Sequence, residues 1–158
     1  MKNKSVKHKH KSQNQSDLPG LVAEKKTIYW LAAILIITFM AYSSALQNQF
    51  QINWDDQKYV IENPTIRNLS IDNIKTFFSE YYMGNYHPLS MLSLAINYHF
   101  NELSPMFYHF TNILLHLINT LLVFLLIRHL VKDIEIALIT AALFGLHTLH
   151  VESVAWVS

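Results

Sequence analysis

The sequence predicts an all-α membrane protein with three transmembrane helices and a large extracytoplasmic first loop that carries interfacial helices. Hydrophobic residues make up 51% of its 158 residues, and charged residues only 15%, against about 25% in soluble domains. Long stretches of the chain contain no charged residue, and seven of the twelve Lys and Arg residues precede the first of them. With no cysteine in the chain, disulfides and thiolate metal sites are excluded.

The first segment, residues 1–26, is polar and basic and has no apolar period, so we expect a disordered cytoplasmic tail. A basic run can contact nucleic acid, but this one has no aromatic side chain to stack on bases, and we expect no nucleic-acid partner. Basic residues that precede an apolar stretch instead favour the cytoplasmic side of a membrane.

Residues 28–46 carry no charge and are long enough to cross a hydrocarbon core of about 30 Å as a helix. A cleaved signal peptide is the alternative, because residues 43–45 resemble a cleavage site made of small side chains. The long polar tail and the length of the apolar run favour an uncleaved anchor.

Two further spans are predicted over residues 107–131 and 134–150, joined by a basic turn that holds Arg128 and Lys132. A basic turn belongs on the cytoplasmic side, so the chain should run in, out, in and out. This topology predicts a multi-pass integral membrane protein in contact with lipid. We assign it to a bacterial inner (plasma) membrane with the N-terminus in the cytoplasm.

The loop at residues 47–106 holds six acidic and three basic residues, as expected outside the cytoplasm. A short helix is predicted from Ile71 to Phe78 with Ser70 as its N-cap, since the apolar residues share one face. Another is predicted from Pro88 to Phe100, which is too short to span a membrane and should lie at its surface or re-enter it.

Polar residues interrupt the second predicted span at helical spacing: His109, Asn112, His116 and Asn119 lie three, four and three residues apart. Such a stripe faces the interior of a helix bundle. It most often holds helices together by hydrogen bonds, and contact with a substrate is the alternative.

The predicted topology brings the chemically suggestive side chains to one, non-cytoplasmic, face. They are Asp55, Asp56, His87, His147, His150 and Glu152. The adjacent carboxylates Asp55 and Asp56 can close a turn, or one can accept a proton from a hydroxyl while the other orients it or holds a metal. His147, His150 and Glu152 are ligand types for zinc, but their spacing differs from the HExxH motif; hydrogen bonding at the interface and phosphate recognition are the alternatives.

The chain has no sequence motif that binds a soluble nucleotide or forms a serine-hydrolase elbow. An activated donor, if one is used, should therefore be carried in the membrane.

Four short motifs resemble, in order, those of the transmembrane O-mannosyltransferases with tetratricopeptide repeats and their bacterial relatives. They are FQINWDD at 50–56, HPLSMLS at 87–93, HFTNILLH at 109–116 and LFGLHTLHVESVAW at 143–156. More distantly the chain is similar to the protein O-mannosyltransferases and other GT-C glycosyltransferases that use polyprenyl-phosphate sugars. The resemblance covers residues from about 28 to the end.

This resemblance implies a glycosyltransferase that moves a mannose-like sugar from a polyprenyl-phosphate donor to a hydroxyl acceptor. By position, Asp55 corresponds to the catalytic acid of the first loop, with Asp56 beside it where the protein mannosyltransferases usually have Glu. His87 falls near the lipid-phosphate site, and we assign His147, His150 and Glu152 to donor binding as well. Some members use a divalent metal at the first-loop acid, so a metal at Asp55 is possible but is not determined by the sequence.

The family has more spans than this chain, usually followed by helical repeats, and the chain has no internal repeat. We therefore expect residues 27–158 to be the N-terminal part of a GT-C-like domain that is inactive alone and needs a C-terminal part or another subunit. Two alternatives remain open: a non-catalytic membrane anchor or assembly subunit, and a small metal-dependent membrane hydrolase that uses the histidines.

Overall fold

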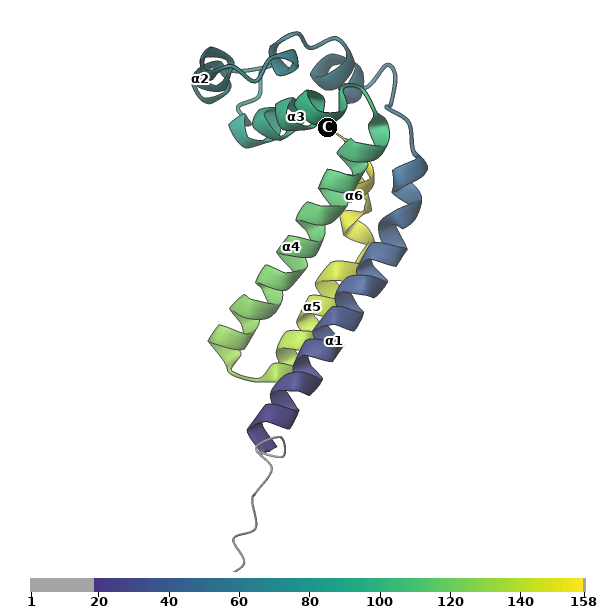
Figure 1. Ribbon diagram of the computed structural model, residues 1–158, viewed down its shortest axis with the longest axis vertical. Coiled ribbons are helices and arrows are strands. Elements are labelled where there is room, and N and C mark those ends of the chain that lie inside the picture. The colour runs from purple at the N-terminus through teal and green to yellow at the C-terminus, as the bar shows by residue number, and fades with distance from the viewer. Residues whose placement is uncertain (1–18, 158) are drawn as a thin grey trace, which may run out of the picture.

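The computed structural model describes residues 19–157 and is built from helices (Figure 1). Its α-helices are α1 (Pro19–Tyr42), α2 (Ile71–Ser79), α3 (Pro88–Asn101), α4 (Pro105–Val131), α5 (Ile134–Leu146) and α6 (Val151–Ala155). Short helical turns join them, and within the described range the single β-bridge pairs Tyr82 with Asn85. The predicted all-helical class is confirmed.

Two helical segments are long and apolar enough to cross a membrane, Glu24–Gln47 and Pro105–Val131. A third candidate is the pair Ile134–Leu146 and Thr148–Ala155, which is bent by 47° at the break between them. The described residues therefore hold two candidate spans, or three if the bent pair is counted as one, and the third span stays a prediction.

The first helix begins earlier than predicted. Residues 19–26, which we expected to be part of a disordered tail, belong to α1, and residues 1–18 lie outside the described range. Proline is favoured in the first turn of a helix, and the following Leu, Ala, Glu and Lys residues are good helix formers. The absence of an apolar period therefore did not prevent helix formation here.

The third span is not the continuous helix predicted over 134–150. α5 ends at Leu146, His147 takes an extended conformation, and a 3₁₀ turn at Thr148–His150 leads into α6. The ring of His147 ends the helix locally, because its Nδ1 accepts a hydrogen bond from the backbone N–H of Leu149 at 3.2 Å. This cap starts a new turn in a different direction.

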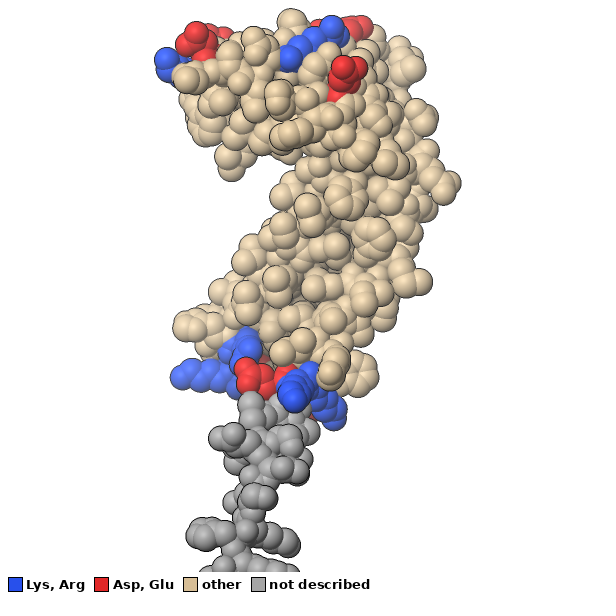
Figure 2. Space-filling model, viewed as in Figure 1, with Lys and Arg blue, Asp and Glu red and all other residues tan. Residues whose placement is uncertain are grey.

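Helices α1, α4 and α5 pack side by side into one bundle, with α5 in contact with both of the others (Figure 1). In the view of Figure 2, charged side chains lie at the two ends of the molecule and an uncharged band separates them. Lys25, Lys26, Arg128 and Lys132 come from the end where α1 begins and where α4 joins α5. An uncharged band between charged ends is the surface expected of a bundle surrounded by lipid.

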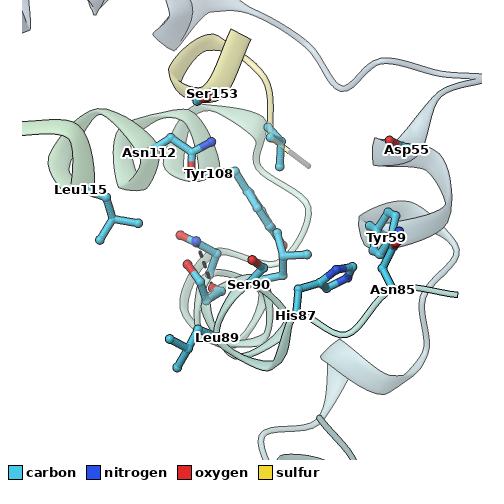
Figure 3. Close-up of a pocket in the computed structure, with 14 residues that line it drawn as sticks. Asp55, Tyr59, Asn85, His87, Leu89, Ser90, Tyr108, Asn112, Leu115 and Ser153 are labelled. Atoms are coloured by element: carbon cyan, nitrogen blue, oxygen red, sulfur yellow. Dashed lines mark hydrogen bonds between the residues drawn. The ribbon is translucent and has the colours of Figure 1, made fainter. Parts of the chain in front are cut away.

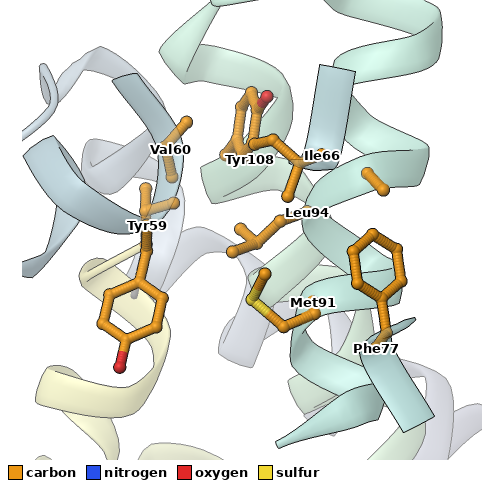
Figure 4. Packing of buried hydrophobic residues seen from close by; sticks show 9 residues of the cluster. Tyr59, Val60, Ile66, Phe77, Met91, Leu94 and Tyr108 are labelled. Carbon is orange, nitrogen blue, oxygen red and sulfur yellow. The ribbon is translucent and has the colours of Figure 1, made fainter. Parts of the chain in front are cut away.

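The head of the molecule, residues 50–104, lies at the opposite end and carries α2 and α3 (Figure 1). Both helices were predicted with nearly the observed bounds, and Ser70 caps α2 by accepting a hydrogen bond from the N–H of Asn73 at 3.2 Å. Tyr59, Val60, Ile66, Phe77, Met91, Leu94, Ala95, Tyr108 and Val157 form the buried core of the head (Figure 4). Tyr108 belongs to α4, so this core joins the head to the bundle.

The phenol of Tyr82 should make the head sensitive to alkaline pH. Its hydroxyl donates to the carbonyl of Lys58 at 2.7 Å, and burial, followed by the nearby Tyr59 and Glu62, raises the pKa of Tyr82 above 10.0. Because the folded protein holds this proton more tightly than the unfolded chain, the contribution to stability is complete below pH 10 and is lost as the pH rises through the raised pKa. Phenolate absorbance can be titrated in the wild type and in Tyr82→Phe. The difference between the two curves reports Tyr82 and should have its midpoint above pH 10.

The matched control for this titration is Tyr81→Phe, which removes an exposed phenol next to Tyr82. If the difference curve between wild type and Tyr82→Phe had its midpoint at or below pH 10, the burial of the Tyr82 phenol would be contradicted.

Candidate functional site

The acidic pair opens a helical turn at the start of the head. Asn53 has a positive φ of 72°, which turns the chain, and Asp55 and Asp56 then begin a helical segment that continues to Ile61. Successive residues of a helix point about 100° apart. The two neighbouring carboxylates therefore diverge and enter different surroundings.

Asp56 is completely buried, with 0% of its surface exposed. Its carboxylate accepts a hydrogen bond from the backbone N–H of Gln51 at 2.9 Å, which closes the turn that contains Asn53. Asp55, by contrast, is exposed. Of the two carboxylates, only that of Asp55 is freely accessible to a molecule that approaches the head.

Asp55 lines a cavity in the head, which we call the Asp55 pocket (Figure 3). Its volume is about 680 Å³, and it lies between the acidic turn, α3 and the start of α4. Figure 3 shows Asp55 on one side of the cavity and Ser90 on the other. His87 lies next to Tyr59, with 5.1 Å between the centres of the two rings. Its other polar lining residues are Asn85, Ser93, Asn97, Tyr108, Asn112 and Ser153.

The N-terminus of α3 contributes to this pocket. His87 is the N-cap residue and Pro88 occupies the first turn, and His87, Leu89 and Ser90 all line the cavity. The first backbone N–H groups of a helix have no acceptor within the helix, and together with the helix dipole they favour an anion. The imidazole of His87 and the hydroxyl of Ser90 add two side-chain hydrogen-bond donors at the same place. This end of the pocket is suited to a phosphate group.

Asp56 lines a second cavity of about 550 Å³, which we call the Asp56 pocket. It lies between the turn before Asp56, the first turns of α4 and the segment from Thr148 to Trp156. Its polar lining residues are Gln49, Gln51, Asp56, His109, Thr148, Glu152 and Trp156. The short helix α6 separates the two cavities, because Glu152 lines the Asp56 pocket and the next residue, Ser153, lines the Asp55 pocket.

The structure thus divides the residues that we assigned to donor binding. His87 lies with Asp55, and Glu152 lies with Asp56. His147 and His150 line neither cavity. The backbone carbonyl of His147 accepts a hydrogen bond from the hydroxyl of Tyr42 at 3.2 Å, and the ring of His150 lies 4.5 Å from that of Phe144.

The polar stripe of α4 is divided in the same way. Asn112 donates a hydrogen bond to the carbonyl of Trp156, and Nε2 of His116 lies 3.0 Å from the carbonyl oxygen of Gly145, so both join α4 to the segment that follows it. His109 is 1% exposed and lines the Asp56 pocket, whereas Asn119 is exposed. Asn112 and His116 therefore link helices, while His109 and Asn112 each line a cavity.

Among residues 19–157, no group of three or more His, Asp or Glu side chains is arranged to hold a metal ion. The described residues therefore do not fit the zinc site considered for His147, His150 and Glu152. They also do not fit a metal held at Asp55 by side chains of this part of the chain alone.

Several pocket residues were not identified from the sequence. Ser90, Ser93 and Asn97 of α3 line the Asp55 pocket and lie at positions i, i+3 and i+7 of one helix. The helical spacing of these three polar residues could have predicted that they share one face of α3. Tyr59, Asn85 and Tyr108 come from separate elements and gave no comparable signal, because only the tertiary fold brings them together.

The described residues thus form an all-helical protein with two to three candidate membrane spans. Comparison with known proteins identifies the relatives. The chain is 27% identical to protein O-mannosyl-transferase F38B6.6 of Caenorhabditis elegans, over 94% of this chain and 24% of that protein. It is 30% identical to protein O-mannosyl-transferase TMTC3 of Mus musculus over 66% of this chain and 12% of that protein.

A third relative is protein O-mannosyl-transferase Tmtc1 of Drosophila melanogaster, 40% identical over 46% of this chain and 8% of that protein. The curated homologues of this chain are therefore protein O-mannosyl-transferases of the TMTC group, as the four motifs indicated. The chain spans between 8% and 24% of the length of these relatives. No protein-family model and no solved structure matches it. Because the relatives come from animals, they give no support to the bacterial membrane that we predicted.

Proposed function

We propose that this chain contributes the acidic first loop of a membrane glycosyltransferase, which moves a mannose-like sugar from a polyprenyl-phosphate donor to a hydroxyl acceptor. The observation that carries this proposal is the Asp55 pocket. The exposed carboxylate of Asp55 and the N-terminus of α3 line the same cavity, and His87 and Ser90 belong to that helix terminus. The homology to protein O-mannosyl-transferases supports the same activity.

In this mechanism the carboxylate of Asp55 takes the proton of the acceptor hydroxyl as the hydroxyl oxygen attacks C1 of the sugar. The new bond forms between that oxygen and C1, the bond from C1 to the phosphate oxygen breaks, and the lipid phosphate leaves with the electron pair. His87, Ser90 and the backbone N–H groups of α3 stabilise the charge on the leaving phosphate. Asp56, buried and bonded to Gln51, holds the turn that presents Asp55.

We further propose that the spans at about 28–46, 107–131 and 134–150 place the head outside the cytoplasm. The basic residues at the opposite end of the bundle support this orientation. Two exposed apolar residues, Leu89 of α3 and Leu115 of α4, also line the Asp55 pocket. A lipid donor could therefore enter the pocket sideways from the bilayer, with its chain along these residues.

A transfer assay on membranes that contain the protein as its gene encodes it tests this function. We expect transfer from polyprenyl-phosphate mannose and none from a soluble nucleotide sugar. His87→Ala should raise the KM for the lipid donor about 10- to 100-fold, since a hydrogen bond to a charged group contributes roughly 1.5–3 kcal/mol. The matched control is His99→Ala, which removes an exposed histidine at the other end of α3.

If His87→Ala and His99→Ala changed the KM for the lipid donor equally, the placement of the donor phosphate beside His87 would be contradicted. If no sugar were transferred from any lipid-linked donor, the proposed enzymatic function would be rejected and the non-catalytic membrane anchor would be favoured.

A further inference from the structure

The Asp56 pocket is not used by the transfer reaction described above, yet it has the properties of a binding site. It is lined by a fully buried carboxylate, that of Asp56, and by His109, which is 1% exposed. Neither ring nitrogen of His109 makes a hydrogen bond of good geometry, although the backbone of Asn48 and the carboxylate of Asp56 lie within electrostatic range. Nε1 of Trp156 is also buried without a partner in the part of the chain that the structure describes.

Charge excludes one class of ligand from this pocket. Two carboxylates, those of Asp56 and Glu152, line it, and its lining within the described range includes no Lys or Arg. A phosphate or carboxylate group would be repelled at short distance by both acids. The phosphate of the proposed donor therefore belongs to the Asp55 pocket and not here.

The hydrogen-bonding inventory narrows the ligand further. Ionised carboxylates only accept hydrogen bonds, the indole N–H of Trp156 only donates, and a neutral imidazole does one of each. A simple cation could pair with the carboxylate of Glu152 but could accept nothing from the indole. A hydroxyl group both donates and accepts, so a molecule with several hydroxyls can pair with Glu152, His109 and Trp156 together. The amides of Gln49 and Gln51 add two further groups that donate and accept.

The apolar part of the lining is suited to the same ligand. Leu149, Val151, Ala155 and the indole of Trp156 complete the cavity. A sugar ring presents hydroxyls around its edge and C–H groups on its face, and the C–H face can pack on an aromatic or aliphatic wall. We propose that the Asp56 pocket binds an uncharged, polyhydroxylated ligand, namely a sugar residue, at a site separate from the one that Asp55 faces. The proposal does not depend on sugar transfer in the Asp55 pocket.

Ligand-observed saturation-transfer NMR on the full chain in detergent micelles tests this inference with methyl α-mannoside as the probe. We expect saturable binding that Glu152→Gln weakens about tenfold, because a hydrogen bond to a charged carboxylate becomes one to a neutral amide oxygen. Trp156→Phe, which keeps a ring but removes the indole N–H, should weaken it severalfold. The control is Glu102→Gln, which neutralises an exposed carboxylate that lines neither cavity and should leave binding unchanged.

Three further probes separate the alternatives: methylammonium, N-acetylglycinamide and inorganic phosphate, the last read by competition. Tighter saturable binding of methylammonium would identify a cation site, and equal binding of N-acetylglycinamide a peptide site. Displacement of the mannoside by phosphate would show an anion site. Each of these results, or a mannoside affinity that Glu152→Gln does not change, would overturn the proposal. Equal weakening by Glu102→Gln would do the same, because the effect of Glu152→Gln would then not come from the Asp56 pocket.

Discussion

Replacing Asp55 with Asn should lower the rate of sugar transfer about 10²- to 10⁴-fold, which is the usual contribution of a general base. The amide has nearly the shape of the carboxylate but cannot take a proton from the acceptor hydroxyl. Because Asp55 is exposed and its side chain faces a cavity, the substitution should leave the fold and its thermal unfolding unchanged. Transfer from polyprenyl-phosphate mannose, measured together with the melting temperature, checks both parts of this expectation.

Two companion variants make the result specific to Asp55. Asp72→Asn removes a 92% exposed carboxylate of α2, whose salt bridge with Lys75 is a surface contact, and should change neither rate nor stability. Asp56→Asn alters a buried group that accepts a backbone hydrogen bond, so its main effect should be on stability. A full loss of transfer in Asp56→Asn, with normal folding and an active Asp55→Asn, would exchange the roles of the two acids.

The separation of the acidic pair shows where reasoning from the sequence stops. The two residues are adjacent, so the sequence predicted one shared site. The difference between them follows from the helical turn that they begin, which directs successive side chains about 100° apart. Which of the two enters which cavity depends on α4 and α6, which lie far away in the chain.

The predictions that succeeded depend on local patterns. Apolar length identified the first two spans, Ser70 identified the start of α2, and Pro88 identified the start of α3. The third candidate span starts at Ile134 as predicted, but its helix is broken and bent by 47° between Leu146 and Thr148. The helix breaks at His147 because a ring nitrogen of this residue caps the next turn. The amino-acid composition of the segment could not predict that hydrogen bond.

The assignment of His147, His150 and Glu152 to one binding motif had the same weakness. The three residues lie close together in sequence, but after the break at His147 only Glu152 lines a cavity. His150 instead packs against Phe144 and His116, which lies 5.3 Å away between ring centres. Short spacing therefore indicated a common neighbourhood correctly but could not indicate which side chains face open space.

The second large effect is expected at Gly145, where helices α1, α4 and α5 meet. A Cβ atom added there would lie 2.6 Å from Oγ1 of Thr38 in α1 and 3.1 Å from Cγ2 of Thr120 in α4. The carbonyl of Gly145 also lies 3.0 Å from Nε2 of His116, so the backbone cannot move away without losing that contact. Gly145→Ala should therefore lower the free energy of unfolding by about 1–3 kcal/mol, the usual cost of inserting an extra methyl group into a packed core.

Unfolding by sodium dodecyl sulfate in mixed micelles measures this change, with Leu143→Ala on the exposed face of α5 as a control that should have little effect. Thr38→Ala removes the atom closest to the new methyl group, and Oγ1 of Thr38 makes no hydrogen bond within residues 19–157. The double variant should therefore be more stable than the sum of the two single changes predicts, by about 1 kcal/mol or more. Strict additivity would mean that α1 does not approach α5 this closely, because the two substitutions can interact only if the three helices pack at Gly145.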